Sequence, residues 1–289
     1  MRMRAVVELV RAPAALTVPG DVVAGAAAAR WPFRVATPAL AAASACLYWA
    51  GMALNDYADR DIDAVERPGR PIPSGRVTPR FALGLAAGLT ATGVGLAGLA
   101  GGRRALGVAG PLAATVWAYD LVLKGTPAGP AAMAAARGLD VLMGAGATAG
   151  GLRRAAPAAG LVAGHTLAVT ALSRREVTGA DPWLPRTTLA ATGVIGALAG
   201  FAGRRGSAPQ RLAGGALLAV YGATFGRAQL AAVRDPGPRP LQRAVGAGIL
   251  GMMPLQAALA AGAGAPVAAL PVAAAFPLAR RLSRKVSPT

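Results

Sequence analysis

Long apolar runs separated by short polar connectors make up most of the chain. A helix that crosses a bilayer needs about 20 mostly apolar residues. The runs therefore predict nine membrane helices, over 12–30, 36–55, 81–100, 104–123, 128–150, 155–173, 187–203, 210–231 and 244–261. A further apolar run, 265–279, is interrupted by three prolines and indicates either a tenth span or a segment lying at the membrane surface. No internal repeat or low-complexity linker divides the chain, so we expect a single all-α domain over residues 1–289.

Composition supports a membrane protein. Of the 289 residues, 54% are apolar and only 15% are charged, which excludes an ordinary soluble enzyme and a disordered chain. The net charge of +18 would suggest nucleic acid as the partner of a soluble protein. Here the basic residues lie in short clusters between apolar runs, as membrane orientation produces. We therefore expect a lipid bilayer and no nucleic acid. The single cysteine, Cys46, excludes a disulfide framework and a cysteine-based metal site.

The basic residues also predict an orientation. Glu8 interrupts the first apolar stretch, and many spans follow, so this stretch indicates a membrane helix rather than a cleaved signal peptide. The N-terminal side of the membrane carries 15 Lys and Arg against 13 if there are nine spans, and 19 against 9 if there are ten. The positive-inside rule then predicts a multi-pass protein of the cell membrane with a cytoplasmic N-terminus, and it favours the tenth span.

One connector, residues 55–80, differs from all others because it holds five of the twelve acidic residues. Its sequence begins NDYADRDIDAVERPGRPIPSGRV. If this segment is helical, Asp56, Asp59 and Asp63 fall within about 60° of one another, while Asp61 points elsewhere. Three carboxylates on one face repel unless a cation lies between them. Oxygen-only ligands suit Mg²⁺, and Asn55 can add a neutral carbonyl oxygen.

Arginines follow this cluster at positions 67, 70 and 76, spaced by prolines and glycines in a loop that can fold back. Guanidinium groups match phosphate oxygens in bidentate geometry. Together the two features predict a magnesium-assisted diphosphate site. The alternative is a solvated acidic connector whose charges balance the neighbouring arginines.

These residues resemble the first aspartate-rich motif of the UbiA-type intramembrane prenyltransferases, NDxxDxxxD followed by RPxRPxxxG. The opening LVRAPAALTVPGDVVAG, with Arg11, also resembles the family's first helix. The resemblance extends from about residue 9 to 262 and implies a bundle of nine transmembrane helices. It further implies a prenyl diphosphate donor, a small-molecule acceptor that we do not identify, and Mg²⁺ held by Asn55, Asp56, Asp59 and Asp63. Arg67 and Arg70 are then expected to bind the substrate.

A second element, YDLVLK, lies at the end of the fourth predicted span. It is similar to a Tyr-and-Lys element that follows the family's fourth helix, where the lysine lies near diphosphate. The resemblance implies catalytic roles for Tyr119 and Lys124, beside Asp56, Asp59 and Asp63, and a substrate-binding role for Asp120. The alternative is an ordinary ion pair between Asp120 and Lys124, which are four residues apart on a helix.

The fifth predicted span carries Arg137, Asp140 and Gly144 on one face. An arginine at the bilayer centre costs about 2.5–3.5 kcal/mol, so Arg137 must be paired or face a wet cavity. Two interpretations remain open: a local pair with Asp140, or a substrate-binding position in the cavity. His165, the only histidine, lies in the middle of a span and indicates a packed, hydrogen-bonded side chain rather than a base.

The sequence departs from the family after the sixth predicted span. The family carries a second motif there, DxxxD, whereas this chain has SRREVTGAD. Glu176 is the best candidate for a remaining metal ligand, and Asp181 also fits a turn. This departure, together with YDLVLKGTPAGP and RGLD, resembles the EboC-like branch of the superfamily.

The implied reaction is ionisation of the donor's C–O bond to an allylic cation, which the acceptor captures. Tyr57 or Tyr119 can face that cation through its ring. One rival hypothesis is a membrane protein for binding or transport that keeps the fold without turnover. Another keeps the enzyme but gives it a hydrophilic cyclitol or sugar acceptor.

Overall fold

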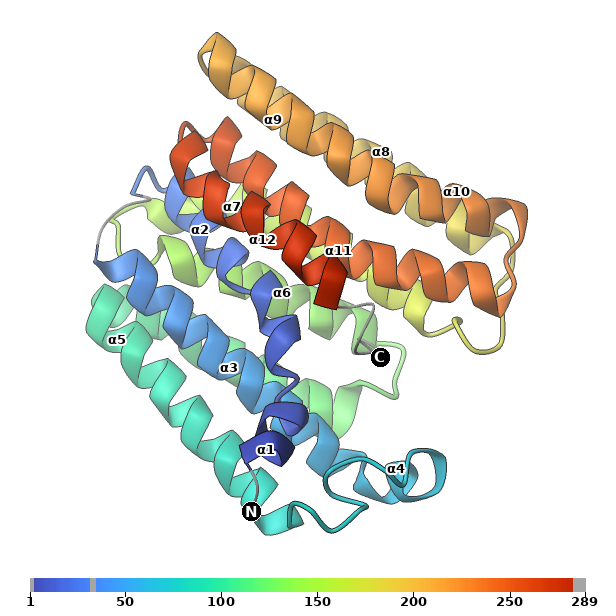
Figure 1. Cartoon of the computed structure of the whole chain (residues 1–289). Helices are drawn as coiled ribbons and strands as arrows, with labels where there is room; N and C mark the ends of the chain where they lie inside the picture. Colours follow the sequence, from blue (N-terminus) through green and yellow to red (C-terminus); the bar gives the residue numbers. More distant parts are fainter. Residues whose placement is uncertain (1–2, 32–34, 283–289) are drawn as a thin grey trace.

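The computed structural model describes residues 3–31 and 35–282, and these residues form helices without any strand (Figure 1). Two short segments, η1 and η3, are 3₁₀-helices, and two others, η2 and η4, are π-helices. In chain order the elements are α1 (Met3–Leu9), η1 (Ala12–Thr17), α2 (Pro19–Ala28), α3 (Ala36–Ala58), α4 (Arg60–Glu66), α5 (Pro79–Ala118), η2 (Tyr119–Leu123), α6 (Gly129–Ala145), α7 (Gly151–Ser173), α8 (Trp183–Ala202), η3 (Gly203–Arg205), α9 (Ala208–Tyr221), η4 (Gly222–Gly226), α10 (Arg227–Arg234), α11 (Pro238–Gly262) and α12 (Pro266–Leu282).

Five stretches of the described chain are long and apolar enough to cross a membrane: Ala36–Ala58, Pro79–Leu123, Gly151–Ser173, Ala208–Arg234 and Pro238–Gly262. A shorter apolar helix covers Ala15–Ala28. The 45-residue stretch Pro79–Leu123 is interrupted at Gly102, whose φ of 63° and ψ of −156° are not helical. That break falls between the third and fourth expected spans. The multi-pass, all-α architecture is confirmed, while the count of nine spans stays a prediction.

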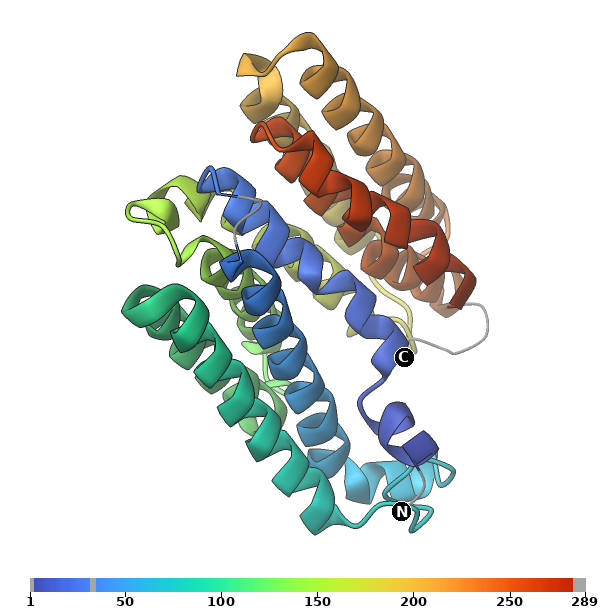
Figure 2. The same ribbon diagram turned by 60° about the vertical axis from the view of Figure 1, so that its left-hand side comes forward.

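The helices form one bundle. α3 packs along α5 at one edge of the bundle, and α8, α9 and α10 lie at the opposite edge (Figures 1 and 2). Between these edges α2 contacts α6, α7 and α11, so α2 joins the two halves. The largest core cluster includes the fully buried side chains of Leu172, Tyr221, Phe225 and Leu255. Apart from residue 265, the apolar run 265–279 belongs to α12, which packs on α11.

His165 is a structural residue of this core. Its Nε2 lies 3.0 Å from the carbonyl oxygen of Gly248, and its Nδ1 lies 3.0 Å from the hydroxyl of Tyr221. A carbonyl oxygen only accepts, so Nε2 carries the hydrogen and Nδ1 accepts from the Tyr221 hydroxyl. The ring also packs edge-on against Phe225. Both nitrogens are therefore satisfied, as the sequence interpretation expected.

The polar connector forms one end of the bundle, where α4 and the loop after it lie beside α1 (Figures 1 and 2). A small apolar cluster holds this loop, because Ile72 and Val77 pack with Leu9 and Leu54. An exposed ion pair adds to it: Arg76 Nη1 lies 2.6 Å from Glu8 Oε2, and Nη2 lies 3.0 Å from Oε1. The loop is thus fastened to the N-terminal segment by packing and by one bidentate contact.

Small residues set the distance between α2 and α6. A Cβ added to Gly25 would lie 1.8 Å from the backbone oxygen of Val141, and one added to Gly144 would lie 2.3 Å from that of Val22. Neither backbone can move aside without separating the two helices. Close approach of this kind is how membrane helices associate when no hydrophobic effect drives them together.

We predict that Gly25→Ala lowers the free energy of unfolding by about 1–3 kcal/mol, the range for overpacking a tight contact. The measurement is thermal unfolding of the purified protein in detergent. Gly160→Ala on α7 is the matched control, because its new Cβ would meet nothing within 4 Å. Equal melting temperatures for the two variants would contradict the close contact between α2 and α6.

The Glu8–Arg76 contact leads to a second prediction, which concerns how hydrogen exchange in the loop depends on pH. The hydrogen bond from Arg76 lowers the pKa of Glu8 from its ordinary value of 4.5. The contact is therefore complete above pH 4.5 and is lost as the pH falls through the lowered pKa. We expect Glu8→Gln to speed hydrogen exchange in residues 69–77 at pH 7 by less than about fivefold, since exposed pairs contribute little.

Below the lowered pKa of Glu8, the wild type should exchange as fast as Glu8→Gln once intrinsic rates are corrected for. Glu66→Gln, which changes an exposed acid on α4, is the control and should leave the exchange unchanged at both pH values. Faster exchange in that control would show that any lost charge, not this contact, loosens the loop.

Candidate active site

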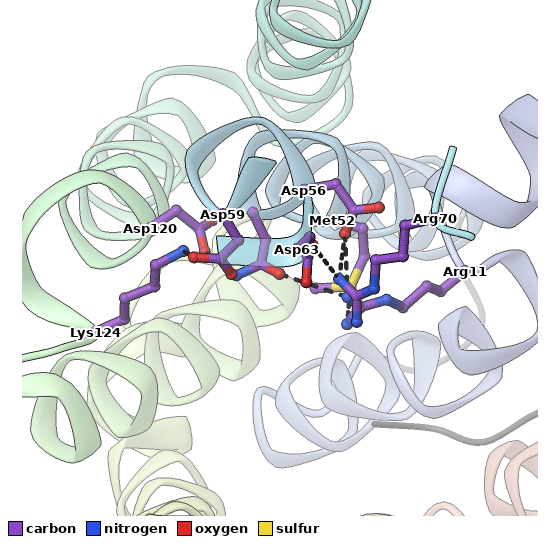
Figure 3. Close-up of polar contacts among 9 residues, drawn as sticks. Arg11, Met52, Asp56, Asp59, Asp63, Arg70, Asp120 and Lys124 are labelled. Atoms are coloured by element: carbon purple, nitrogen blue, oxygen red, sulfur yellow. Dashed lines mark hydrogen bonds and ion pairs between the residues drawn. The ribbon is translucent and has the colours of Figure 1, made fainter. Parts of the chain in front are cut away.

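Two carboxylates of the connector converge on one guanidinium nitrogen. Asp56 lies at the end of α3 and Asp63 lies in α4, and both are buried, at 4% and 3% exposure. Arg70 Nη1 lies 3.0 Å from Asp56 Oδ1 and 3.0 Å from Asp63 Oδ2 (Figure 3). The loop that carries Arg70 therefore folds back on the acidic segment, and one cation neutralises two acids.

The side chain of Asp59 does not join Asp56 and Asp63 at Arg70. α3 ends at Ala58, Asp59 has a φ of −89° and a ψ of 2°, and α4 begins at Arg60. The continuous helix assumed for this segment is thus wrong at Asp59. Its Oδ1 lies 2.5 Å from Lys124 Nζ, across the gap between α3 and η2 (Figure 3). Asp61 is exposed and pairs with Arg60 at 3.4 Å, so it points away from the cluster as expected.

Arg11 completes the cluster and was not among the site residues predicted from the sequence. Its side chain donates to Asp56 Oδ1 at 3.1 Å and to Asn55 Oδ1 at 3.5 Å (Figure 3). Its backbone is left-handed, with a φ of 46° and a ψ of 48°. Residues other than glycine seldom adopt this conformation, and such strain concentrates at functional sites. The signals in the sequence were its place directly before the first predicted span and the resemblance of the segment around it to the family's first helix.

Lys124 pairs with Asp59 and not with Asp120. The helix-end ion pair between Asp120 and Lys124, which was the alternative prediction, therefore does not form. The reason is local: residues 119–123 form a π-helix, in which the Lys124 amide bonds the Tyr119 carbonyl at 2.9 Å. The wider turn removes the α-helical spacing on which the pair with Asp120 depended. Asp120 is buried and accepts a hydrogen bond from Asn55 Nδ2 at 3.3 Å.

A cavity of about 250 Å³ opens beside this cluster. Arg11, Asn55, Tyr119 and Asp120 line one end, and Ser44, Arg137 and Asp140 line the other. Eleven residues of α3 separate Asn55 from Ser44, which corresponds to about 16 Å along the helix axis. The wall between these ends is mostly apolar and includes Val18, Leu47, Met52, Leu112, Val116 and Met133, together with Gly51, Ala136 and the aromatic side chain of Tyr48. The cavity is therefore an apolar chamber with a polar group at each end.

We call the end of the cavity lined by Ser44, Arg137 and Asp140 its inner end. The polar contacts there join side chains of α2, α3, α6 and α11. Arg137 Nη2 lies 2.9 Å from Asp21 Oδ2 and donates to the Thr17 carbonyl at 3.2 Å. Asp140 instead accepts a hydrogen bond from Ser44 at 2.6 Å. Gln256 donates to Asp21 at 2.7 Å. The partner of Arg137 is thus Asp21 rather than Asp140, and Arg137 is both paired and exposed to the cavity.

Glu176 lies near the mouth of the site but outside the acidic cluster. Arg174 donates to the Thr126 carbonyl, which ties the loop after α7 to the segment after Lys124. Burial raises the pKa of Glu176, and the positive charge of Arg67 opposes that shift. Arg67 itself is exposed at the rim. Asp181 lines a separate surface groove with Asp235.

The donor set suits a hard divalent cation, because it consists of carboxylate and amide oxygens. Asp56 and Asp63 already point at a single cationic atom, Arg70 Nη1, which is the convergence that an ion bridging two carboxylates requires. No group of three or more His, Cys, Asp or Glu residues is assembled for metal binding anywhere in residues 3–31 and 35–282. The residues therefore fit Mg²⁺ through two convergent acids, not through a cup of three.

Comparison with known proteins identifies the family. A model of the UbiA prenyltransferase family matches residues 17–176. Digeranylgeranylglyceryl phosphate synthase of Methanopyrus kandleri is 44% identical over 43% of this chain and 46% of its own length. The enzyme of the same name from Natronomonas pharaonis is 37% identical over 61% of this chain and 62% of its own length. The matches thus span about half to three-fifths of these relatives.

Solved structures share the fold. One, concerning digeranylgeranylglyceryl phosphate synthase in membranes, has a TM-score of 0.67 at 17% identity, covering 90% of this chain and 98% of that one. The apo structure of a UbiA homolog from Aeropyrum pernix K1 has a TM-score of 0.59 at 23% identity, covering 82% and 96%. With the family model matching more than half of its residues, this multi-pass membrane protein belongs to the UbiA prenyltransferase family.

Proposed function

We propose that the protein is a Mg²⁺-dependent prenyltransferase that moves an isoprenyl group from a prenyl diphosphate to a small-molecule acceptor within the membrane. The observation that carries this proposal is the apolar cavity opening beside Asp56, Asp63 and Arg70. A prenyl diphosphate has the same division into a charged end and an apolar chain. Membership of the family supports the proposal.

Asp56 and Asp63 would hold the metal ion, with Asn55 beside Asp56 as a further oxygen donor and Glu176 as a candidate for a second position. Asp59, predicted from the sequence as a third carboxylate ligand, pairs with Lys124 instead and is not part of this convergent pair. When bound, Mg²⁺ supplies positive charge that stabilises the departing diphosphate. The chain adds its own cations at the same mouth, because Arg11, Arg70 and Lys124 all lie within ion-pair distance of these acids. Arg67 stands exposed at the rim and offers a further guanidinium to phosphate oxygens.

The cavity wall would bind the isoprenoid chain and shield the allylic cation. Leu47, Leu112 and Val116 offer apolar surface to the isoprenoid chain and exclude water that would capture the allylic cation. The ring of Tyr119 lines the cavity and can face that cation. Arg60 lies over the ring of Tyr57, 4.9 Å from its centroid, so this ring is already engaged. We therefore assign the cation-facing role to Tyr119.

Three broader assignments complete the proposal. We infer that residues 1–289 act as one domain, since α11 packs against α2 and α7. We infer that the end of the bundle with α1 and α4 faces the cytoplasm, as the distribution of basic residues predicts. Assignment to the EboC-like branch stays a prediction.

The first test removes single carboxylates. Asp56→Asn and Asp63→Asn should each lower Mg²⁺-dependent diphosphate release by at least about 100-fold, the loss expected when one group that stabilises developing charge is removed. The assay supplies membranes containing the protein with a prenyl diphosphate and an acceptor extract. Asp61→Asn is the control, because Asp61 is exposed and pairs only with Arg60 among the described residues.

Full activity of Asp56→Asn and Asp63→Asn would end the scheme. Mg²⁺-dependent protection of the wild type by prenyl diphosphate, without any product from any acceptor, would instead favour a binding or transport protein. Removal of metal by chelation should abolish both protection and diphosphate release.

The inner polar group favours an acceptor that carries hydroxyl groups. Ser44, Arg137 and Asp140 line the end of the cavity farthest from Asn55. Among the described residues Oδ1 of Asp140 has no hydrogen-bond partner, so an apolar ligand there would leave this atom unsatisfied. The relatives named above are synthases of a glyceryl phosphate compound. A glyceryl phosphate or a hydrophilic cyclitol or sugar would meet the chemistry of this end, whereas an unsubstituted aromatic ring would not.

The second test separates acceptor from donor. Ser44→Ala should raise the acceptor KM by about two- to tenfold, the effect of one hydrogen bond, while leaving the donor KM unchanged. Thr166→Ala is a matched control, because Thr166 is also buried but, among the described residues, bonds only the Val162 carbonyl and lies outside the cavity. Kinetics with glyceryl phosphate lipids and with polyols would measure both constants. If Ser44→Ala left the acceptor KM unchanged for every active acceptor, the inner end of the cavity would have no part in binding the acceptor.

A further inference from the structure

A pocket of about 710 Å³ opens at the end of the bundle opposite α4, where α2 ends and α7 begins (Figure 1). Its walls come from α2, α7, α8, η3, α9, α11 and the short connection after α11. Volumes of about 300–1,000 Å³ are typical of sites for small molecules. None of its lining residues lines the cavity beside Asp56, so the pocket is separate from the candidate active site.

The polar side chains of this pocket offer hydrogen-bond donors. Among the described residues that line it, the polar side chains are those of Arg30, Arg154 and Gln210. Gln210 Oε1 accepts a hydrogen bond from the Ser207 amide at 2.8 Å, so the amide nitrogen is the group that Gln210 has left to donate. A guanidinium group only donates. A ligand that matches this lining therefore brings acceptor oxygens.

The charge around the pocket indicates an anion. Arg30 and Arg154 have no ion pair within the described part of the chain. All lining residues fall in four stretches of the sequence that contain no aspartate or glutamate, 22–55, 141–175, 182–234 and 236–289. Two guanidinium groups that line one pocket repel each other when no acid lies between them. An anion bound between them would replace this repulsion with attraction.

Neither arginine occupies a position that its own helix favours. Arg30 follows the end of α2 with a φ of 63°, in the left-handed conformation that glycine or asparagine usually adopts after a helix. Arg154 lies in the first turn of α7, where the helix dipole favours negative rather than positive charge. Local structure therefore does not account for these two residues. An anion near the first turn of α7 would be favoured by the helix dipole and by both guanidinium groups.

The deeper part of the pocket is apolar. Leu161 lies seven residues after Arg154 on α7, about 10 Å farther into the bundle along the helix axis. Ala158, Ala199 and Leu259 line the pocket with it. The pocket thus has a cationic rim and an apolar interior. Its ligand is expected to combine an anionic group with an apolar chain.

We propose that this pocket binds an anionic phospholipid, with its phosphate between Arg30 and Arg154 and an acyl chain along Leu161 and Leu259. Arginine binds phosphate oxygens in bidentate geometry, and basic pockets between membrane helices are suited to such head groups. Free phosphate would match the donors but would leave the apolar interior without a partner. Because the pocket is separate from the cavity beside Asp56, this site does not depend on the proposed reaction.

The test cross-links lipid to the pocket. The full chain is reconstituted in phosphatidylcholine bilayers with phosphatidylglycerol that carries a photoactivatable group in its acyl chain. Mass spectrometry then measures the yield of cross-links to residues 157–161 and 259–265. We expect Arg30→Gln and Arg154→Gln each to lower this yield by about fivefold, the factor that one basic side chain near a membrane surface contributes. Arg30→Lys and Arg154→Lys should keep most of the yield, because the charge remains.

The matched control is Arg103→Gln, which should leave the yield unchanged. Arg103 is exposed and lies at the same end of the bundle, next to the break in α5, but it does not line the pocket. An equal loss in this control would show that total charge, not the pocket, sets the yield. No loss in Arg30→Gln and Arg154→Gln would show that the pocket binds no anionic lipid. Either result overturns the proposal.

Two further probes separate a lipid from other ligands. Photoactivatable phosphatidylcholine should give at least about fivefold fewer cross-links to the same residues, and an equal yield would overturn the preference for an anionic head group. Inorganic phosphate should not displace the labelled phosphatidylglycerol. Displacement would show that a free anion occupies the site without help from an acyl chain, and it would overturn the proposal of a lipid.

Discussion

The structure of the active-site end depends on one interaction, the sharing of Arg70 between Asp56 and Asp63. Two buried carboxylates repel each other and lose hydration, so they need a cation between them. Arg70 can supply it only because its loop returns to α3, and the loop returns because Ile72 and Val77 pack on Leu9 and Leu54. Apolar packing of the loop thus fixes the Arg70 guanidinium between the two carboxylates. A divalent ion placed at the same point would satisfy the same two acids, so the local fold is compatible with both states.

Spacing along the sequence predicted part of this site. Asp56 and Asp63 were expected on one face and both contact Arg70, but the break at Asp59 lies between them, so Arg70 rather than helical spacing joins them. Asp59 fails the same rule because α3 ends just before it, and an angle computed on a continuous helix cannot include that break. Lys124 shows a related limit. Its four-residue spacing from Asp120 suggested a local pair, but the π-helix alters the register and Asp59 competes from another element. Local periodicity is reliable only where the helix is regular.

The residue pairs at the inner end of the cavity could not be predicted from the sequence, because the partners lie far apart along the chain. Arg137 has an acid three residues away, yet it pairs with Asp21 on α2. Asp140 bonds Ser44 on α3, and Gln256 on α11 reaches Asp21. The two pairs of Asp21 form because α2 contacts both α6 and α11, and its contact with α6 depends on Gly25 and Gly144 permitting close approach. The sequence did predict that a buried arginine would be paired or would line a cavity, and it does both. Which residue it pairs with is set by packing between helices.

Charge is divided unevenly between the two parts of the chain, and this division connects the chemistry with the membrane. Eleven of the twelve acidic residues lie before residue 182, in the part that carries the cavity, and nine of them lie within residues 17–176, which match the family model. There acids and bases pair with one another and build the mouth and the inner end of the cavity. Beyond that point only Asp235 is acidic, so the basic residues of α8 to α12 have almost no carboxylate to pair with. Since a bilayer penalises an unpaired cation, these helices remain stable only with their arginines at helix ends, in water, or against lipid phosphate. The same electrostatic constraint therefore gives one half of the protein a mouth of paired acids and bases and leaves the helices of the other half with few acids.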